Sequence, residues 1–98
     1  MAGLDEIIHQ PIRLRIMSTL VGLDKDEQVD FTYLKRLLSI TDGNLGAHLS
    51  RLEEAGYVII TKNFVNHKPK ATVRLSAQGS KAFQAYPNLI ESVIKNRR

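Results

Sequence analysis

The stretch at residues 41–58, TDGNLGAHLSRLEEAGYV, has the pattern of a helix with a marked beginning and a marked end. Thr41 stands where a capping side chain accepts a hydrogen bond from a free backbone N–H, and Gly56 stands where a left-handed residue closes a helix. A buried face is predicted by leucines at helical spacing: Leu45, Leu49 and Leu52. The opposite face is polar, so we expect it to contact something outside its own domain.

Two more helices are predicted upstream of this stretch. Pro11 suits the first turn of one, over residues 12–21, whose apolar arc is wider than a single core contact needs. Thr32 can cap the other, whose inward face is predicted to be Leu34, Leu37 and Leu38. A polar loop at 22–28, a very short strand at 29–31 and a tight turn at 39–42 connect these helices.

A β-hairpin is predicted downstream. Residues 57–64, YVIITKNF, are rich in β-branched and aromatic side chains and indicate a strand. Residues 65–70, VNHKPK, read as a polar turn with a basic tip, and 71–76, ATVRLS, alternate as the returning strand. Ser76 can cap a last helix that runs towards residue 96 and that Pro87 must kink or divide.

This order predicts an α+β, mostly helical fold: a winged helix-turn-helix with a two-stranded β-hairpin wing and a C-terminal dimerisation helix. A chain of 98 residues is long enough for one small domain and too short for two. We therefore predict a single domain over residues 1–98, with its parts at 32–56 (helix-turn-helix), 57–76 (wing), and 4–22 and 77–96 (terminal helices).

The charge is sorted along the chain. The formal net charge is +4, and no Asp or Glu occurs between Glu54 and Glu91. The cations inside that gap are Lys62, Lys68, Lys70, Arg74 and Lys81. This segregation favours a positive lobe that binds a polyanion.

Three pieces of the chain, HQPIRLRIMSTL (9–20), FTYLKRLLSITDGNLGAHLSRLEEAGYV (31–58) and NHKPKATVRLSAQGSKAF (66–83), also carry a family resemblance. Together they resemble the small winged-helix transcriptional regulators of the MarR/ArsR type over roughly residues 9–83. The resemblance implies that residues 42–55 are the recognition helix, which enters the major groove of double-stranded DNA. It implies base-reading or nearby contacts for Asp42, Gly43, Asn44, Ala47, His48 and Arg51.

Alternatives remain for some of these residues. Arg51 could pair with Glu53 or Glu54, and His48, which flanks the apolar stripe, could be a packing residue. Gly46 and Ala47 fall where many relatives carry a larger polar side chain, which either permits close approach to DNA or removes base readout. Phosphate contacts are expected from the first helix of the pair and from the wing, at Thr32, Lys35, Arg36, Lys62, Asn66, His67, Lys68, Lys70 and Arg74.

A homodimer is expected from the wide apolar arc of the first helix and from a heptad-like seam in the last. The predicted interface residues are Leu4, Ile8, Leu14, Phe83, Tyr86, Ile90, Val93 and Ile94. A two-fold dimer would read a pseudo-palindromic operator. The alternative is that both apolar stripes only close one small core.

Enzyme chemistry is not expected. The histidines are His9, His48 and His67, far apart and in no metal-ligand pattern, and the chain contains no cysteine. We predict no metal and no cofactor. No membrane span is expected either, so we predict a cytoplasmic, nucleoid-associated protein. From the predicted DNA-binding fold we expect a regulator that represses transcription by steric occlusion. A winged helix used for protein–protein contacts without DNA affinity is the main alternative, and RNA binding is a further one. An effector, if one exists, would bind in the dimer interface or compete with DNA.

Overall fold

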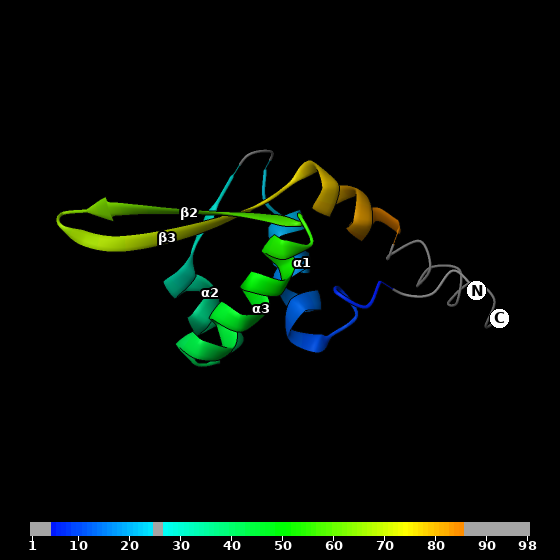
Figure 1. Cartoon of the computed structure of the whole chain (residues 1–98), viewed down its shortest axis with the longest axis horizontal. Coiled ribbons are helices and arrows are strands. Elements are labelled where there is room, and N and C mark those ends of the chain that lie inside the picture. Colours follow the sequence, from blue (N-terminus) through cyan, green and yellow to red (C-terminus); the bar gives the residue numbers. More distant parts are fainter. Residues whose placement is uncertain (1–4, 25–26, 86–98) are drawn as a thin grey trace.

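The computed structural model describes residues 5–24 and 27–85, in which a long hairpin projects from a group of short helices (Figure 1). The elements in chain order are α1 (Pro11–Val21), β1 (Val29–Asp30), α2 (Phe31–Leu38), α3 (Asp42–Glu54), β2 (Val58–Val65) and β3 (Lys68–Leu75). Residues 77–85 form a further helix. This order confirms the predicted α+β winged helix-turn-helix, with β2 and β3 as the wing.

The helix ends follow local capping chemistry. Pro11 occupies the first turn of α1. The Thr41 side chain accepts a hydrogen bond from the backbone N–H of Asn44 at 3.1 Å, which fixes the start of α3. Gly56 has φ +81° just after α3, where a left-handed residue is needed. Ser76 caps the helix at 77–85 by accepting from Gly79 N–H at 2.9 Å. These four predictions are confirmed.

The start of α2 differs from the prediction. The helix begins at Phe31, and Asp30 is its N-cap residue, so Thr32 lies inside the first turn and does not cap it. The boundary is set by the sheet, because β1 pairs with β3 through Val29–Val73 and Asp30–Thr72. This pairing holds Asp30 in an extended conformation and leaves the next residue as the first that can turn into the helix.

The wing is longer and its turn tighter than predicted. The three strands are antiparallel in the order β1-β3-β2, and β2 pairs with β3 without interruption from Val58–Leu75 to Val65–Lys68. Only Asn66 and His67 form the turn, with φ of 52° and 64°. A two-residue turn with both φ values positive matches the twist of the strands, and Asn and His tolerate that region better than most residues. Residues 68–70 therefore belong to β3.

The core is built from α1, α2, α3, the segment before α1 and the base of the wing. Its buried residues are Ile8, Ile16, Met17, Leu20, Leu34, Leu38, Leu45, Leu49, Leu52, Val58 and Val73. The inward stripe of α2 is narrow, because Leu34 and Leu38 are buried whereas Leu37 is 43% exposed. The prediction that Leu37 points inward was wrong, since this eight-residue helix meets the core along one row of side chains.

Gly79 marks a close approach between the helix at 77–85 and the start of β2. A Cβ atom at residue 79 would lie 2.1 Å from the backbone oxygen of Tyr57. The hydrogen bond from Ser76 N–H to the same oxygen, at 3.1 Å, holds the two segments together. Only glycine allows this crossing, which closes the base of the wing against the core.

Candidate nucleic-acid interface

The outward face of α3 is polar and open. Asp42, Gly43, Asn44, Ala47 and Arg51 are all exposed, whereas the leucines of the same helix are buried. Within the described part of the chain, Arg51 forms no ion pair with Glu53 or Glu54, so its guanidinium is not committed to either. The structure thus leaves five of the six predicted recognition residues exposed to solvent on α3.

His48, the sixth, lies on the flank of α3 and is half-buried. Its Nδ1 atom is 3.2 Å from Nη1 of Arg13 in α1, and the Arg13 Nε–H donates to the backbone oxygen of Ile7. Burial, and then the positive charge of Arg13, lower the pKa of His48 below its ordinary 6.5. A neutral imidazole accepts the hydrogen bond from the arginine, so His48 links α3 to α1. Arg13 was not predicted, since no spacing in the sequence relates two residues 35 positions apart.

An ion pair joins the two helices of the helix-turn-helix. Lys35 Nζ of α2 lies 2.8 Å from a carboxylate oxygen of Asp42, the first residue of α3. Both side chains remain partly exposed, at 43% and 72%. The pair offsets the one acidic charge in the first turn of α3, at the helix end whose dipole favours an anion. Thr32 and Arg36 are exposed on α2, where they have open access to solvent.

The pairing of β2 with β3 gives the wing two faces. The inner face continues the core side of the sheet through the pairs Ile60–Val73, Lys62–Ala71 and Phe64–Pro69. The outer face carries Ile59–Arg74, Thr61–Thr72, Asn63–Lys70 and Val65–Lys68. Every residue from 61 to 70 is exposed, including the turn residues Asn66 and His67. The tip therefore has free surface on both sides.

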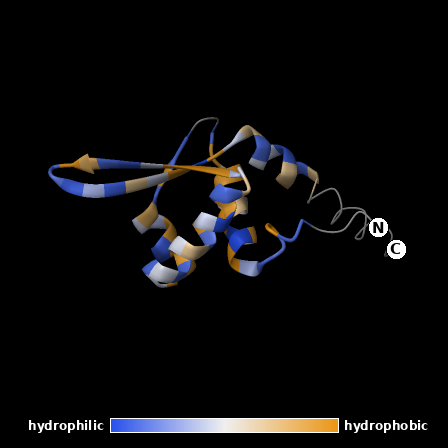
Figure 2. Ribbon diagram, in the orientation of Figure 1, coloured by the Kyte–Doolittle hydropathy of each residue, from blue (hydrophilic) through white to orange (hydrophobic). Residues whose placement is uncertain are grey.

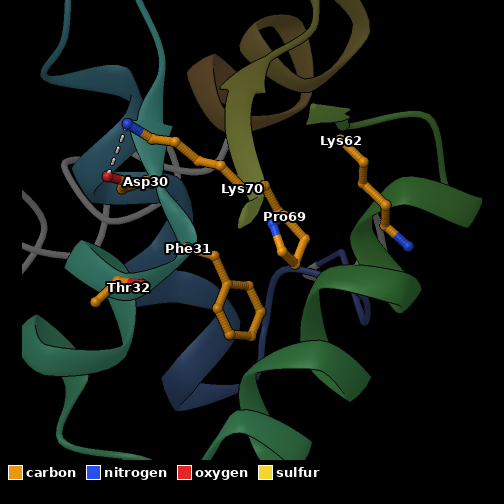
Figure 3. Close-up of a pocket in the computed structure, with 7 residues that line it drawn as sticks. Asp30, Phe31, Thr32, Lys62, Pro69 and Lys70 are labelled. Atoms are coloured by element: carbon orange, nitrogen blue, oxygen red, sulfur yellow. Dashed lines mark ion pairs between the residues drawn. The ribbon is translucent and has the colours of Figure 1, made fainter. Parts of the chain in front are cut away.

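A concave surface, here called the wing groove, lies between the inner face of the wing and the two helices of the helix-turn-helix. One part, of about 470 Å³, is lined by Phe31, Gly46, Leu49, Ser50, Glu53, Ile60, Lys62 and Ala71. A second part, of about 330 Å³, is lined by Asp30, Phe31, Thr32, Lys62, Pro69, Lys70 and Ala71 (Figure 3). The two parts share Phe31, Lys62 and Ala71, so a cation borders both parts of the groove, and α3 lines the first of them.

Two predicted phosphate contacts are set apart from Lys62. Lys70 points away from Lys62 and pairs with Asp30 at 3.5 Å (Figure 3). Arg74 is half-buried on the outer face at the base of the wing, where it lines a separate hollow together with Asp24 and Glu27. The structure therefore groups Lys62 with α3, leaves Lys68 at the tip, and keeps Arg74 apart from both.

The predicted dimer residues are only partly within the described chain. Ile8 is 0% exposed and packs in the core of its own chain, so it has no surface left for a partner, and its assignment to an interface was wrong. Leu14 and Phe83 are half-buried against the same core. The remaining predicted residues, Leu4, Tyr86, Ile90, Val93 and Ile94, lie outside the described residues.

Residues 5–24 and 27–85 contain neither a candidate metal site nor a helix that could span a membrane. No three His, Asp or Glu side chains come together there where they could hold a metal ion. None of the helices in these ranges is long and apolar enough to cross a membrane.

Comparison with known proteins adds independent information. The sequence pattern of a winged helix DNA-binding domain matches residues 12–94. An uncharacterized protein of Methanocaldococcus jannaschii is 36% identical over 91 residues, which cover 93% of this chain and 96% of that protein. The structure is similar to a transcriptional regulator homologue from Pyrococcus horikoshii, with a TM-score of 0.83, 26% identity, and coverage of 94% of this chain and 88% of that one.

A MepR–DNA complex from S. aureus has the same fold, with a TM-score of 0.78 and 13% identity, covering 96% of this chain and 74% of that one. The resemblance to small winged-helix regulators that the sequence indicates is confirmed at the level of the winged helix DNA-binding domain.

Proposed function

The chain belongs to the winged helix DNA-binding domain family, and we propose that it is a homodimeric transcriptional regulator that reads double-stranded DNA with α3. The observation that carries this proposal is the open polar face of α3 beside a groove that holds Lys62. The same fold in the MepR–DNA complex, and the regulator homologue of Pyrococcus horikoshii, support it.

The chemistry of the α3 face suits the major groove. That groove is about 12 Å wide, admits an α-helix, and presents a different set of donors and acceptors for each base pair. Asn44 has the amide that can bind adenine through two hydrogen bonds, and Arg51 has a guanidinium that can reach guanine or phosphate. Because the side chains of Gly43 and Ala47 are small, the backbone of α3 could approach the DNA bases closely.

The wing groove suits one strand of the DNA backbone. With α3 in the major groove, the adjacent phosphates would run between α3 and the inner face of the wing, past Lys62. Lys68 at the tip and Arg36 on α2 would then add phosphate contacts farther along the duplex. Lys35 would contribute less to DNA affinity than a free lysine, because its ammonium group is already paired with the Asp42 carboxylate.

We propose a homodimer because part of the apolar surface of α1 stays open. Val21 at the end of α1 is 42% exposed, although it belongs to the apolar arc of that helix. Two copies related by a two-fold axis would set their α3 helices roughly 34–36 Å apart and read a pseudo-palindrome. Bound over a promoter, such a dimer would repress by steric occlusion, and its place would be the nucleoid in the cytoplasm.

The proposal is tested by titrating a labelled generic duplex with the protein and following fluorescence anisotropy at about 50 mM and about 200 mM salt. We expect binding in the micromolar range that weakens steeply with salt, because bound cations release counterions from DNA. Arg51→Ala should weaken binding at both salt concentrations. Lys62→Ala should reduce the salt slope by about 0.9, which is the share of one phosphate contact.

Lys81→Ala is the matched control, since it removes the same charge from an exposed position on the helix at 77–85, and Figure 1 shows that this helix lies far from the wing tip. It should leave affinity and salt slope nearly unchanged. No binding even at about 50 mM salt would refute the regulator and favour a module for protein–protein contacts. Equal effects of Lys81→Ala and Lys62→Ala would indicate attraction by net charge alone.

A further inference from the structure

Phe64 is the most exposed of the large hydrophobic side chains in the described chain, at 77%. It stands near the end of β2, after the polar run Thr61–Asn63 and next to Val65, which is 48% exposed. Figure 2 shows the result: the tip of β2 is hydrophobic, although the middle of the same strand is hydrophilic. The apolar tip is separated from the core by this polar stretch, so packing within the chain does not explain it.

The position of Phe64 is fixed by the hairpin. The two-residue turn makes Val65–Lys68 the last hydrogen-bonded pair, and Phe64–Pro69 the neighbouring pair without mutual hydrogen bonds. Side chains in such pairs lie closest together, and proline loses no strand-to-strand bond there. Phe64 and Pro69 therefore form one apolar ridge on the inner face of the wing, the face that turns towards α3.

The edges of the tip disfavour a second protein strand. From Lys68 to Ala71, β3 pairs only with β2, so both strands of the wing tip have an unpaired edge. Pro69 lacks a backbone donor, and lysines flank the ridge at Lys62 and Lys68. Proline and lysine on an exposed edge block pairing with another sheet, and the positive charges repel a second copy. The same positive charges attract a polyanion, and the apolar ridge between them suits a polyanion that also offers apolar surface.

Duplex DNA has this combination, because phosphates line the rims of its minor groove and proteins insert apolar wedges such as Phe and Pro between the base steps inside. We propose that Phe64, supported by Pro69, is an apolar wedge that the wing places in the minor groove, with Lys62 and Lys68 on the flanking phosphates. This role rests on the proposed function, and it assigns to the wing a contact that carries no charge.

The test uses the absence of tryptophan from the chain. Phe64→Trp introduces a single tryptophan on the ridge, whose emission can be excited selectively, and Val65→Trp introduces one at the adjacent residue on the outer face. Both variants are titrated with an A·T-rich duplex at low salt. We expect Trp emission at residue 64 to shift and to become shielded from acrylamide when DNA binds, with a clearly smaller response at residue 65. Filling the minor groove with netropsin beforehand should remove the response at residue 64.

A second measurement separates the wedge from charge. Phe64→Ala should raise the Kd for the duplex about tenfold, as the loss of one buried aromatic contact would, with an unchanged salt slope. Lys68→Ala should instead flatten that slope by about 0.9. Circular dichroism of both variants checks that the wing is still folded.

The outcomes distinguish this inference from the proposed function. If wild type binds duplex DNA but Trp at residue 64 does not respond, or responds no more than at residue 65, the wedge is refuted and the regulator stands. A response that persists with netropsin would refute the minor-groove position. Emission that changes with protein concentration in the absence of DNA would identify a second copy as the occupant. If wild type binds no duplex at all, both proposals fail together.

Discussion

Arg13 of α1 is hydrogen-bonded to His48 of α3, with 3.2 Å between Nη1 and Nδ1. A titratable side chain on the flank of α3 thus attaches this helix to α1, while the outward face of α3 stays open. The hydrogen bond from the Arg13 Nε–H to the backbone oxygen of Ile7 extends this link to the segment before α1. How firmly α3 is held therefore depends on the charge of one imidazole.

The first prediction concerns pH. The pKa of His48 is lowered in the folded chain, by burial and by Arg13, so the unfolded chain binds a proton more readily than the folded one. The contribution of His48 to stability is complete above its unfolded pKa of about 6.5 and is lost as the pH falls through the lower folded pKa. Urea unfolding at pH 7.5 and pH 5.5 should show this loss in wild type. His48→Asn, whose side-chain oxygen can still accept from Arg13, should lose less stability over the same interval; an equal loss would contradict the assignment.

The second prediction concerns alkaline pH. Tyr57 donates a hydrogen bond to the Asp5 carboxylate, and this bond, together with burial and the negative charge of Asp5, raises the pKa of Tyr57 to about 12. Since the unfolded phenol ionises near 10, stability should fall as the pH rises from about 10 towards 12. Ultraviolet titration should find one tyrosine that ionises late, and Tyr57→Phe should remove it. Its persistence in the variant would show that another tyrosine is responsible.

The third prediction compares two glycines. A Cβ at Gly46 in α3 would meet no atom within 4 Å, whereas one at Gly79 would lie 2.1 Å from the Tyr57 oxygen. Gly46→Ala should therefore raise the free energy of unfolding by about 0.5–1 kcal/mol through helix propensity. Gly79→Ala should lower it by about 3 kcal/mol, because the helix at 77–85 must move off β2. Thermal unfolding measures both changes, and the same sign for the two variants would contradict the packing described.

The fourth prediction concerns Asp42. Asp42→Asn removes the partner of Lys35 and one negative charge from the face that we propose contacts DNA. Stability should fall by less than about 1 kcal/mol, since the pair is exposed and the helix dipole loses one favourable charge. DNA binding should become tighter, with a salt slope steeper by up to about 0.9 because Lys35 is released. Weaker binding would mean that Asp42 itself contacts a base.

Much of the fold is predictable because its signals are local. Thr41, Gly56 and Ser76 each act on backbone groups a few residues away, so the sequence shows where those helices begin and end. The start of α2 is not determined by a local signal of this kind. It depends on the pairing of Asp30 with Thr72 across the sheet, and no pattern near Thr32 reveals that partner.

The candidate site divides in the same way. The exposed face of α3 follows from helical spacing, because burial of the leucines leaves the polar residues outside. The separation of Lys62 from Arg74 depends on which face of the wing each side chain occupies, and the exact turn decides that. The predicted turn of six residues at 65–70 does not define which residues of β2 and β3 pair. The observed two-residue turn, Asn66–His67, fixes this register. The bond between Arg13 and His48 depends on how α1 crosses α3, which only the packed core determines.

The most direct test of the central proposal is a titration of the isotope-labelled protein with a generic duplex, followed by amide chemical shifts in NMR spectra. If α3 and the wing bind DNA, the largest shifts will fall on residues 42–51 and 61–70, and amides of the helix at 77–85 will change little. Shifts that are absent at about 50 mM salt, or that centre on α1 and residues 77–85, would contradict DNA binding through α3 and point to a different partner surface.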